Sequence, residues 1–212
     1  HIYHNRNNLT FSYFAKTIKG NEKCNLVVET MYKFNSDEIC RKIIEINNEG
    51  LIAITNQNSI YYFKTNNGFS LINKYYIDVV SIKDCFKINS IKMYTLDFPD
   101  EKKSNYYLGI CAEYIYQGSY KGAFFLYEID TMSNSLIQKE RIVSFPKPIY
   151  DSCMISDYLI FGMEYYICMF PLIITNTSLA LKKEAKQQQF LNKIISLTNV
   201  GPVNSSNLIL IG

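Results

Sequence analysis

Short apolar segments, separated by asparagine, serine and glycine, recur along most of the chain. This pattern constrains the fold more than any other feature, because segments this short, rich in Ile, Tyr and Phe, suit half-buried strands rather than helices. We expect strands near 25–34, 39–47, 51–56, 59–65, 69–77, 88–98, 106–116, 122–130, 136–144, 148–155, 158–163, 166–174, 192–199 and 207–211. The sequence therefore predicts an all-β protein.

One segment is ambiguous. Residues 179–190, "LALKKEAKQQQF", contain good helix formers, but they are equally compatible with a strand end followed by a polar loop. No other stretch has helical periodicity.

The expected strands fall into groups of four. The groups begin near residues 39, 88, 148 and 190, a spacing of roughly 40–60 residues, which is typical of β-propeller blades. A β-sandwich is the main alternative, since it also uses short strands at regular spacing. We favour a partial β-propeller of about three to four four-stranded blades.

This grouping predicts the domain organisation. Residues 1–212 are expected to form a segment of a single propeller domain, in which residues 1–38 are the end of a preceding blade or a lead-in. Blades are expected near 39–77, 88–144 and 148–183, with an incomplete one from 190. Because that last blade is cut after its second strand, we expect the protein to continue beyond both ends.

The second strand of each group is the most uniformly apolar, as in "LIAIT", "YYLGICA" and "YLIFG". A strand buried on both faces has this composition. Each second strand forms a hairpin with the third, as in "YLGICAEYIYQGSYKGAFFLYEID", residues 107–130. We interpret Gln117 to Gly122 as its surface loop, without a chemical role.

Composition argues against several classes of protein. With 48% hydrophobic residues, a net charge of +3 and 22 basic against 19 acidic residues, the chain is globular and has no concentrated basic face for nucleic acid. The longest apolar run is too short to span a bilayer. One lysine cluster, which we interpret as a solvated strand end or loop, consists of Lys182, Lys183 and Lys186.

The six cysteines are widely spaced and form no CxxC motif, which argues against a disulfide framework. Four lie in apolar runs, where a free thiol behaves as a small hydrophobic side chain: Cys40, Cys85, Cys111 and Cys168.

We find no catalytic motif. The only histidines, His1 and His4, lie at the start of the chain, which excludes histidine-based triads and most zinc sites elsewhere. Of the carboxylates, three are assigned to a loop and two to a strand end: Asp97, Asp100 and Glu101, then Glu128 and Asp130. A pair meeting only in the fold, as in glycoside hydrolysis, remains an alternative. We expect no catalytic, cofactor-binding or metal site, and the sequence assigns no binding residues.

Two further features have a structural and a functional interpretation. Pro146 and Pro148, in "SFPKPIY", fit a connector between blades better than a proline-rich ligand. Four tyrosine pairs fit core packing better than base stacking, because no basic residues are interleaved with them: Tyr61–Tyr62, Tyr75–Tyr76, Tyr106–Tyr107 and Tyr165–Tyr166.

The order of the segments "LGICAEY", "GAFFLYEID", "KPIYDSCMISDYLIFGMEYYICMF" and "SSNLILIG" resembles one region of a known family. It is the three-propeller scaffold family of the cleavage and polyadenylation specificity factor large subunit, the splicing factor 3b large propeller subunit and the damaged-DNA-binding protein large subunit. The resemblance covers about residues 30–212 and is densest over 106–212. Phe124 and the Met163–Glu164 turn depart from the family pattern.

The resemblance implies a non-enzymatic scaffold in the nucleus that binds other protein subunits, without a small-molecule substrate, a cofactor or a membrane. We expect a complex for pre-mRNA 3′-end cleavage and polyadenylation. The alternatives within the family are a spliceosomal subunit and a DNA-repair or ubiquitin-ligase adaptor. Weak or direct contact with single-stranded RNA is the alternative from another class, and a propeller hydrolase is a third.

Overall fold

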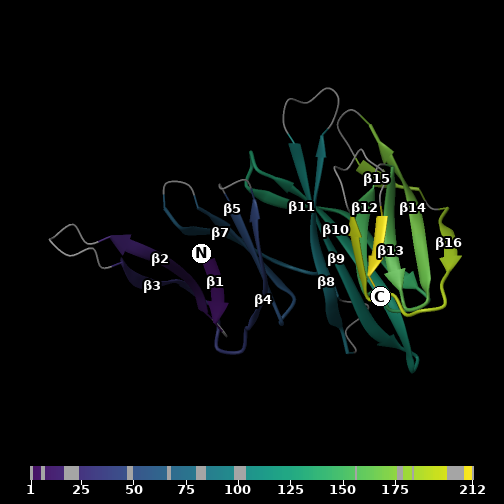
Figure 1. The fold of residues 1–212 in the computed structure, drawn as a ribbon, viewed down its shortest axis with the longest axis horizontal. Helices are drawn as coiled ribbons and strands as arrows, with labels where there is room; N and C mark the ends of the chain where they lie inside the picture. Colours follow the sequence, from purple (N-terminus) through teal and green to yellow (C-terminus); the bar gives the residue numbers. More distant parts are fainter. Residues whose placement is uncertain are drawn as a thin grey trace. The chain divides into compact units, whose positions relative to one another are not determined.

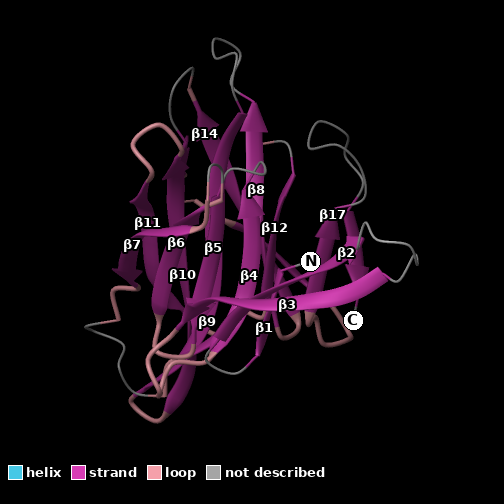
Figure 2. Ribbon diagram, turned by 90° about the vertical axis from the view of Figure 1, so that its left-hand side faces the viewer, coloured by secondary structure: helices cyan, strands magenta, loops and turns pink. Residues whose placement is uncertain are grey.

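A computed structural model describes residues 2–5, 8–16, 24–46, 50–65, 68–79, 85–97, 104–155, 157–175, 179–182, 184–199 and 208–211. In these residues the chain forms eighteen β-strands and no helix (Figure 2). The all-β prediction is confirmed. His1, Asp100, Glu101 and Lys183 lie outside the described residues, as do the side chains of His4 and Asp97.

The chain divides into two compact units, His1–Ile77 and Asp78–Gly212. The first unit contains a three-stranded antiparallel sheet of β1 (Ile2–Asn5), β2 (Asn8–Lys16) and β3 (Cys24–Lys33). It also contains a four-stranded meander of β4 (Cys40–Ile46), β5 (Gly50–Thr55), β6 (Ser59–Lys64) and β7 (Ser70–Tyr76). This meander corresponds to the group expected near 39–77.

The second unit begins with a four-stranded meander of β8 (Lys87–Asp97), β9 (Ser104–Tyr116), β10 (Ser119–Asp130) and β11 (Ser135–Phe145). The next sheet comprises β12 (Asp151–Ile155), β13 (Tyr158–Met163) and β14 (Tyr166–Ile174), with β15 (Leu179–Leu181) and β16 (Lys186–Gln189) both paired to β14. A two-stranded sheet of β17 (Ser196–Asn199) and β18 (Leu208–Ile211) follows (Figure 1). The first of these sheets corresponds to the group expected near 88–144, and β17 and β18 to the one expected from 190. The sheet in between has five strands rather than four, and its last strand, β16, lies beyond the expected end near residue 183.

Burial within the meanders follows the apolar runs of the sequence. Every residue of β5 is buried, and β13 is buried except at its first residue, whereas the outer strand β7 is mostly exposed. The two middle strands of a meander have a neighbour on each side, and the side chains of β5 and most of β13 are buried on both faces, so apolar side chains suit them. The apolar composition of the second strands thus predicts their position correctly.

The first strands of successive sheets lie side by side in the second unit, since β12 contacts both β8 and β17. The core between these sheets contains Phe124 and Phe161, whose ring centroids are 4.7 Å apart, and Phe145, whose centroid is 5.1 Å from that of Phe161. Edge-to-face contacts between aromatic rings stabilise such a core beyond the area they bury.

Three expectations need correction. The loop expected at Gln117 to Gly122 is only the two-residue turn Gln117–Gly118, and β10 begins at Ser119. The ambiguous residues near 179–190 form no helix; they form β15 and, where a polar loop was the alternative, the second strand β16. Strands β1 and β2 were not expected, because their polar residues interrupt the apolar pattern.

The cysteine prediction is confirmed for Cys40, Cys111 and Cys168, which are buried free thiols, and wrong for Cys85, which is exposed. Cys85 lies in a turn with a φ of 50°, outside any strand. Cys153, not singled out from the sequence, is also buried.

Candidate functional site

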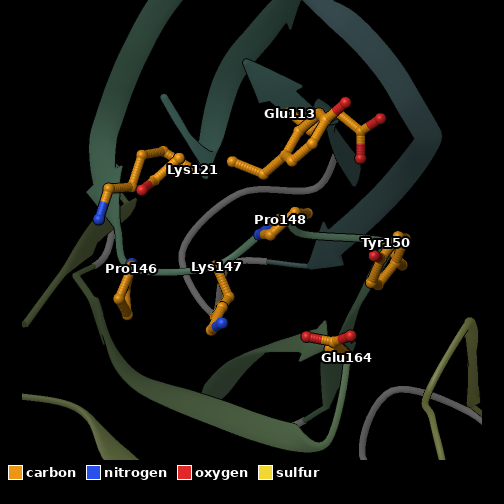
Figure 3. Close-up of a pocket in the computed structure, with 9 residues that line it drawn as sticks. Glu113, Lys121, Pro146, Lys147, Pro148, Tyr150 and Glu164 are labelled. Carbon is orange, nitrogen blue, oxygen red and sulfur yellow. The ribbon is translucent and has the colours of Figure 1, made fainter. Parts of the chain in front are cut away.

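A polar cleft in the second unit has a volume of about 630 Å³. It lies where the β9–β10 turn, the β11–β12 connector and the β13–β14 turn come together (Figure 3). Its lining residues are Glu113, Ser119, Tyr120, Lys121, Pro146, Lys147, Pro148, Tyr150 and Glu164. We call this cavity the cleft.

The shape of the cleft depends on the backbone conformation of the β9–β10 turn and on a close approach at Gly122. Gln117 and Gly118 have φ values of 49° and 74°, which is the conformation of a two-residue hairpin turn whose twist matches the flanking strands. At Gly122 the connector crosses directly over β10. A Cβ at this glycine would lie 2.8 Å from Cγ1 of Ile149 and closer still to the carbonyl oxygen of Lys147. Only glycine allows this approach.

The connector itself carries two prolines, which lack a backbone N–H and therefore cannot donate a hydrogen bond to a β-ladder. The chain therefore leaves the β11 ladder after Phe145 and enters β12 at Asp151. Tyr150 N donates to the carbonyl oxygen of Gly162 at 2.9 Å, which ties the end of the connector to the next sheet. This agrees with the interpretation of Pro146 and Pro148 as a connector.

The charged groups of the cleft are of two kinds. The Glu113 carboxylate is already occupied, since Lys87 Nζ and Asn89 Nδ2 each donate to it at 3.1 Å. Among the described residues, no hydrogen bond or ion pair joins the side chains of Lys121, Lys147 or Glu164 to another side chain. Figure 3 shows Lys121 and Glu164 on different sides of the cleft, with Lys147 between them.

Tyrosine rings complete the lining. Tyr120 is 57% exposed. The Lys193 ammonium lies 4.8 Å from the centroid of the Tyr150 ring, a cation–π contact that places a further positive charge beside the cleft. Tyrosine is enriched at protein-recognition surfaces, whereas charged side chains are usually confined to their polar rim.

A second charged cluster is buried between the first strands of three sheets. The Asp151 carboxylate accepts from Ser90 Oγ at 2.5 Å and from the Leu197 amide at 2.8 Å, and it pairs with Lys92 Nζ at 2.9 Å. Ser196 Oγ also donates to it at 3.3 Å. Because donors from β8 and β17 engage its oxygens, Asp151 is suited to joining strands rather than to taking a proton from a substrate.

The first unit has a buried cluster of its own. Tyr61 Oη donates to Glu38 Oε2 at 2.5 Å, and Lys74 Nζ donates to Glu38 Oε1 at 2.9 Å. Burial alone would raise the pKa of Glu38, but the hydrogen bonds from Tyr61 and Lys74 outweigh it and hold the pKa below its ordinary value. Burial, with the hydrogen bond to Glu38, raises the pKa of Tyr61 to about 12.

The carboxylates assigned to a strand end from the sequence stabilise the β10–β11 hairpin. Glu128 pairs with Lys139 at 2.5 Å, and Asp130 caps the β10–β11 turn by accepting from the amides of Met132 at 2.9 Å and Ser133 at 3.2 Å. Their assignment to a strand end is thus correct. Neither carboxylate lines the cleft.

The tyrosine pairs divide between core and surface. Tyr61–Tyr62 and Tyr106–Tyr107 are buried, as the core-packing interpretation predicts, whereas Tyr76 is 66% and Tyr165 is 41% exposed. Lys182 and Lys186 are exposed, in keeping with a solvated strand end. No tyrosine of these pairs lines the cleft.

Within the described part of the chain, no group of three or more His, Cys, Asp and Glu side chains is placed to hold a metal ion. The same residues include no helix long and apolar enough to cross a membrane.

The cleft was missed in the sequence because its residues are up to about fifty positions apart. The available signals were the Gly122 position in a strand and the two prolines around Lys147. Neither predicts that the two segments meet.

No protein-family model and no curated protein matches the chain. Solved structures do match, 42 chains in all. One is the crystal structure of a candidate 6-phosphogluconolactonase from Bacteroides uniformis ATCC 8492, with a TM-score of 0.54 and 12% sequence identity over 89% of this chain and 50% of that one. The chain spans about half the length of that protein. At this identity the likeness shows the fold alone, and together with the four-stranded antiparallel meanders it identifies the chain as part of a β-propeller.

Proposed function

We propose that this chain is part of a non-enzymatic β-propeller scaffold that binds partner proteins in a nuclear RNA-processing complex. The observation that carries the binding role is the cleft, which combines unpaired charges of both signs with exposed tyrosine on connections between strands. Connections held by a rigid sheet framework are where propellers and other β-proteins commonly place their binding residues.

The state of the buried ionisable groups supports a role without catalysis. An enzyme needs an acid, base or nucleophile whose pKa suits its task and which is free to reach a substrate. Asp151 is engaged by donors from two neighbouring strands. Burial raises the pKa of Cys153 to about 12 and that of Cys40 to about 11, away from the range of a reactive thiolate.

The choice of complex rests on the resemblance of residues 106–212 to the scaffold family. Pre-mRNA 3′-end cleavage and polyadenylation is the branch that we propose, in the nucleus, with other protein subunits as partners. The spliceosomal and DNA-repair branches are the alternatives, and the identity of the copurifying subunits distinguishes the three.

The experiment is purification of the tagged full-length protein from nuclear extract of its own cells, with nuclease treatment, followed by mass spectrometry. We expect stoichiometric subunits of the 3′-end cleavage machinery. Spliceosomal or DNA-repair subunits would replace the proposed branch with one of the alternatives. Recovery of no nuclear subunit, with the tag alone as control, would contradict the scaffold role.

A separate assay addresses catalysis. The similar structure bears the name of a 6-phosphogluconolactonase, so hydrolysis of 6-phosphogluconolactone is the reaction to measure. We expect the full-length protein to leave the uncatalysed rate unchanged. A rate that rises in proportion to protein concentration would refute the non-enzymatic assignment.

A further inference from the structure

A second cavity of about 400 Å³ lies in the same unit, beside β11 and the outer strands β15 and β16. We call it the groove. Apolar side chains form much of it, and the residues that matter here are Ile142, Phe145, Pro146, Phe170, Leu181 and Ala185. Unlike the cleft, the groove presents an apolar surface to a ligand.

The groove exists because the outer strand of its sheet is interrupted. Strand β16 pairs with β14 up to Met169, and β15 pairs with it from Leu172 onward. Phe170 and Pro171 fall between the two pairings, so no outer strand covers β14 there. The Phe170 ring packs against the buried Phe161, and their ring centroids are 5.5 Å apart.

Pro146 lines both cavities. The groove therefore adjoins the cleft across the β11–β12 connector, and one extended ligand lying over Pro146 would contact both. Each cavity alone is small, but a hot spot of binding energy typically combines a pocket for an apolar anchor with a polar surround.

The charge of the cleft indicates the polar part of that ligand. Four lysines line or border the cleft, namely Lys121, Lys147, Lys87 through its pair with Glu113, and Lys193 over Tyr150. They face two carboxylates, Glu113 and Glu164, which leaves a surplus of two positive charges. Lys182 and Glu140 both line the groove and offset each other, so the surplus of two positive charges is unchanged.

We propose that the cleft and the groove together bind an acidic segment of a partner protein, with a large apolar side chain in the groove and carboxylates beside Lys121 and Lys147. The proposal rests on the scaffold function and names the chemistry of one partner. A protein segment fits better than RNA, because the apolar groove requires an apolar anchor, which a phosphate backbone does not carry.

The probe is a phage-displayed library of random dodecapeptides, selected on the immobilised full-length protein. We expect selected peptides to share Asp or Glu residues together with Phe, Tyr, Leu or Ile. A representative peptide, labelled with fluorescein, then serves for affinity measurements by fluorescence anisotropy.

Two variants of the full-length protein test the two halves of the site, and a third variant is the control. Lys121→Glu with Lys147→Glu reverses the cleft charges, and Ala185→Arg fills the groove from an exposed position. Each should weaken the peptide about tenfold or more, because charged contacts and the anchor pocket are lost separately. Lys42→Glu, an exposed lysine of β4, is the matched control and should leave the affinity unchanged.

Circular dichroism confirms that the variants fold, and an excess of a twelve-residue oligouridylate tests the RNA alternative. The proposal is overturned if selection yields no acidic peptide sensitive to both changes, or if the oligouridylate displaces the peptide. If nuclear subunits copurify equally with wild type and both variants, the scaffold function is supported, and the proposal that the cleft and the groove bind the partner is rejected. If no subunit copurifies even with wild type, it is the scaffold function that fails.

Discussion

Asp151→Ala removes the carboxylate that joins the first strands of three successive sheets. The Asp151 side chain is 5% exposed, and its loss leaves the amide of Leu197, the hydroxyl of Ser90 and the ammonium of Lys92 without this acceptor. Alanine offers no replacement, and the space it leaves lies between packed strands.

The loss of stability depends on how well water can hydrate the hydrogen-bond donors that lose the Asp151 carboxylate. Removing one partner of a buried ion pair costs about 3–5 kcal/mol. The Lys92 side chain is 35% exposed and keeps its hydrogen bond to the carbonyl oxygen of Leu197 at 2.8 Å, so it regains part of its hydration. We therefore expect the low end, about 3 kcal/mol of destabilisation. Asp151→Asn, which retains one acceptor oxygen, should lose about half as much.

Hydrogen exchange followed by mass spectrometry gives a local readout. A loss of about 3 kcal/mol should speed exchange of the Leu197 amide by about 100-fold, since each 1.4 kcal/mol is a factor of ten. Glu184→Ala, which removes an exposed carboxylate from the same unit, is the control and should leave exchange unchanged. Equal protection of Leu197 in wild type and Asp151→Ala would refute the view that Asp151 joins these strands.

Three other perturbations test separate parts of the structure. Gly122→Ala should destabilise the second unit by about 1–3 kcal/mol, because its Cβ would displace the connector at Lys147; scanning fluorimetry should show a lower Tm, and an unchanged Tm would contradict the close approach. The pKa of Glu38 is lowered from 4.5, so its contribution to stability is present above about pH 4.5 and is lost as the pH falls below it. Urea unfolding at pH 7 and pH 4 should therefore show a smaller pH effect in Glu38→Gln, and an identical effect would refute the assignment. Iodoacetamide at pH 8 should label the exposed Cys85 in the native protein, whereas Cys153, whose burial raises its pKa to about 12, should react only after unfolding.

The strands of this protein were largely predictable, because their signal is local. The apolar run "LIAIT" and the turn residues around it place β5 within one residue of its observed bounds. Strands β15 and β16 carry weaker signals, since "KQQQ" is polar and depends on its pairing with β14 for its conformation. Tertiary pairing overrides local propensity at such outer positions.

The turn after β9 shows that the sequence does not predict the exact length of a turn. The glycine at 122 suggested a longer loop, yet the reversal is complete at Gln117–Gly118 and Gly122 lies within β10. Glycine in a strand marks either a turn or a close approach of backbone, and the sequence does not distinguish the two.

The all-β class, the two four-stranded meanders and the buried position of their middle strands follow from the sequence alone, because apolar periodicity and turn residues act over a few neighbours. Where charges and cavities meet depends on the tertiary structure. Lys92, Asp151 and Leu197 are far apart along the chain, and so are Lys121 and Glu164. They come together only through the stacking of sheets and the path of the connector over Gly122, which depend on contacts between distant residues.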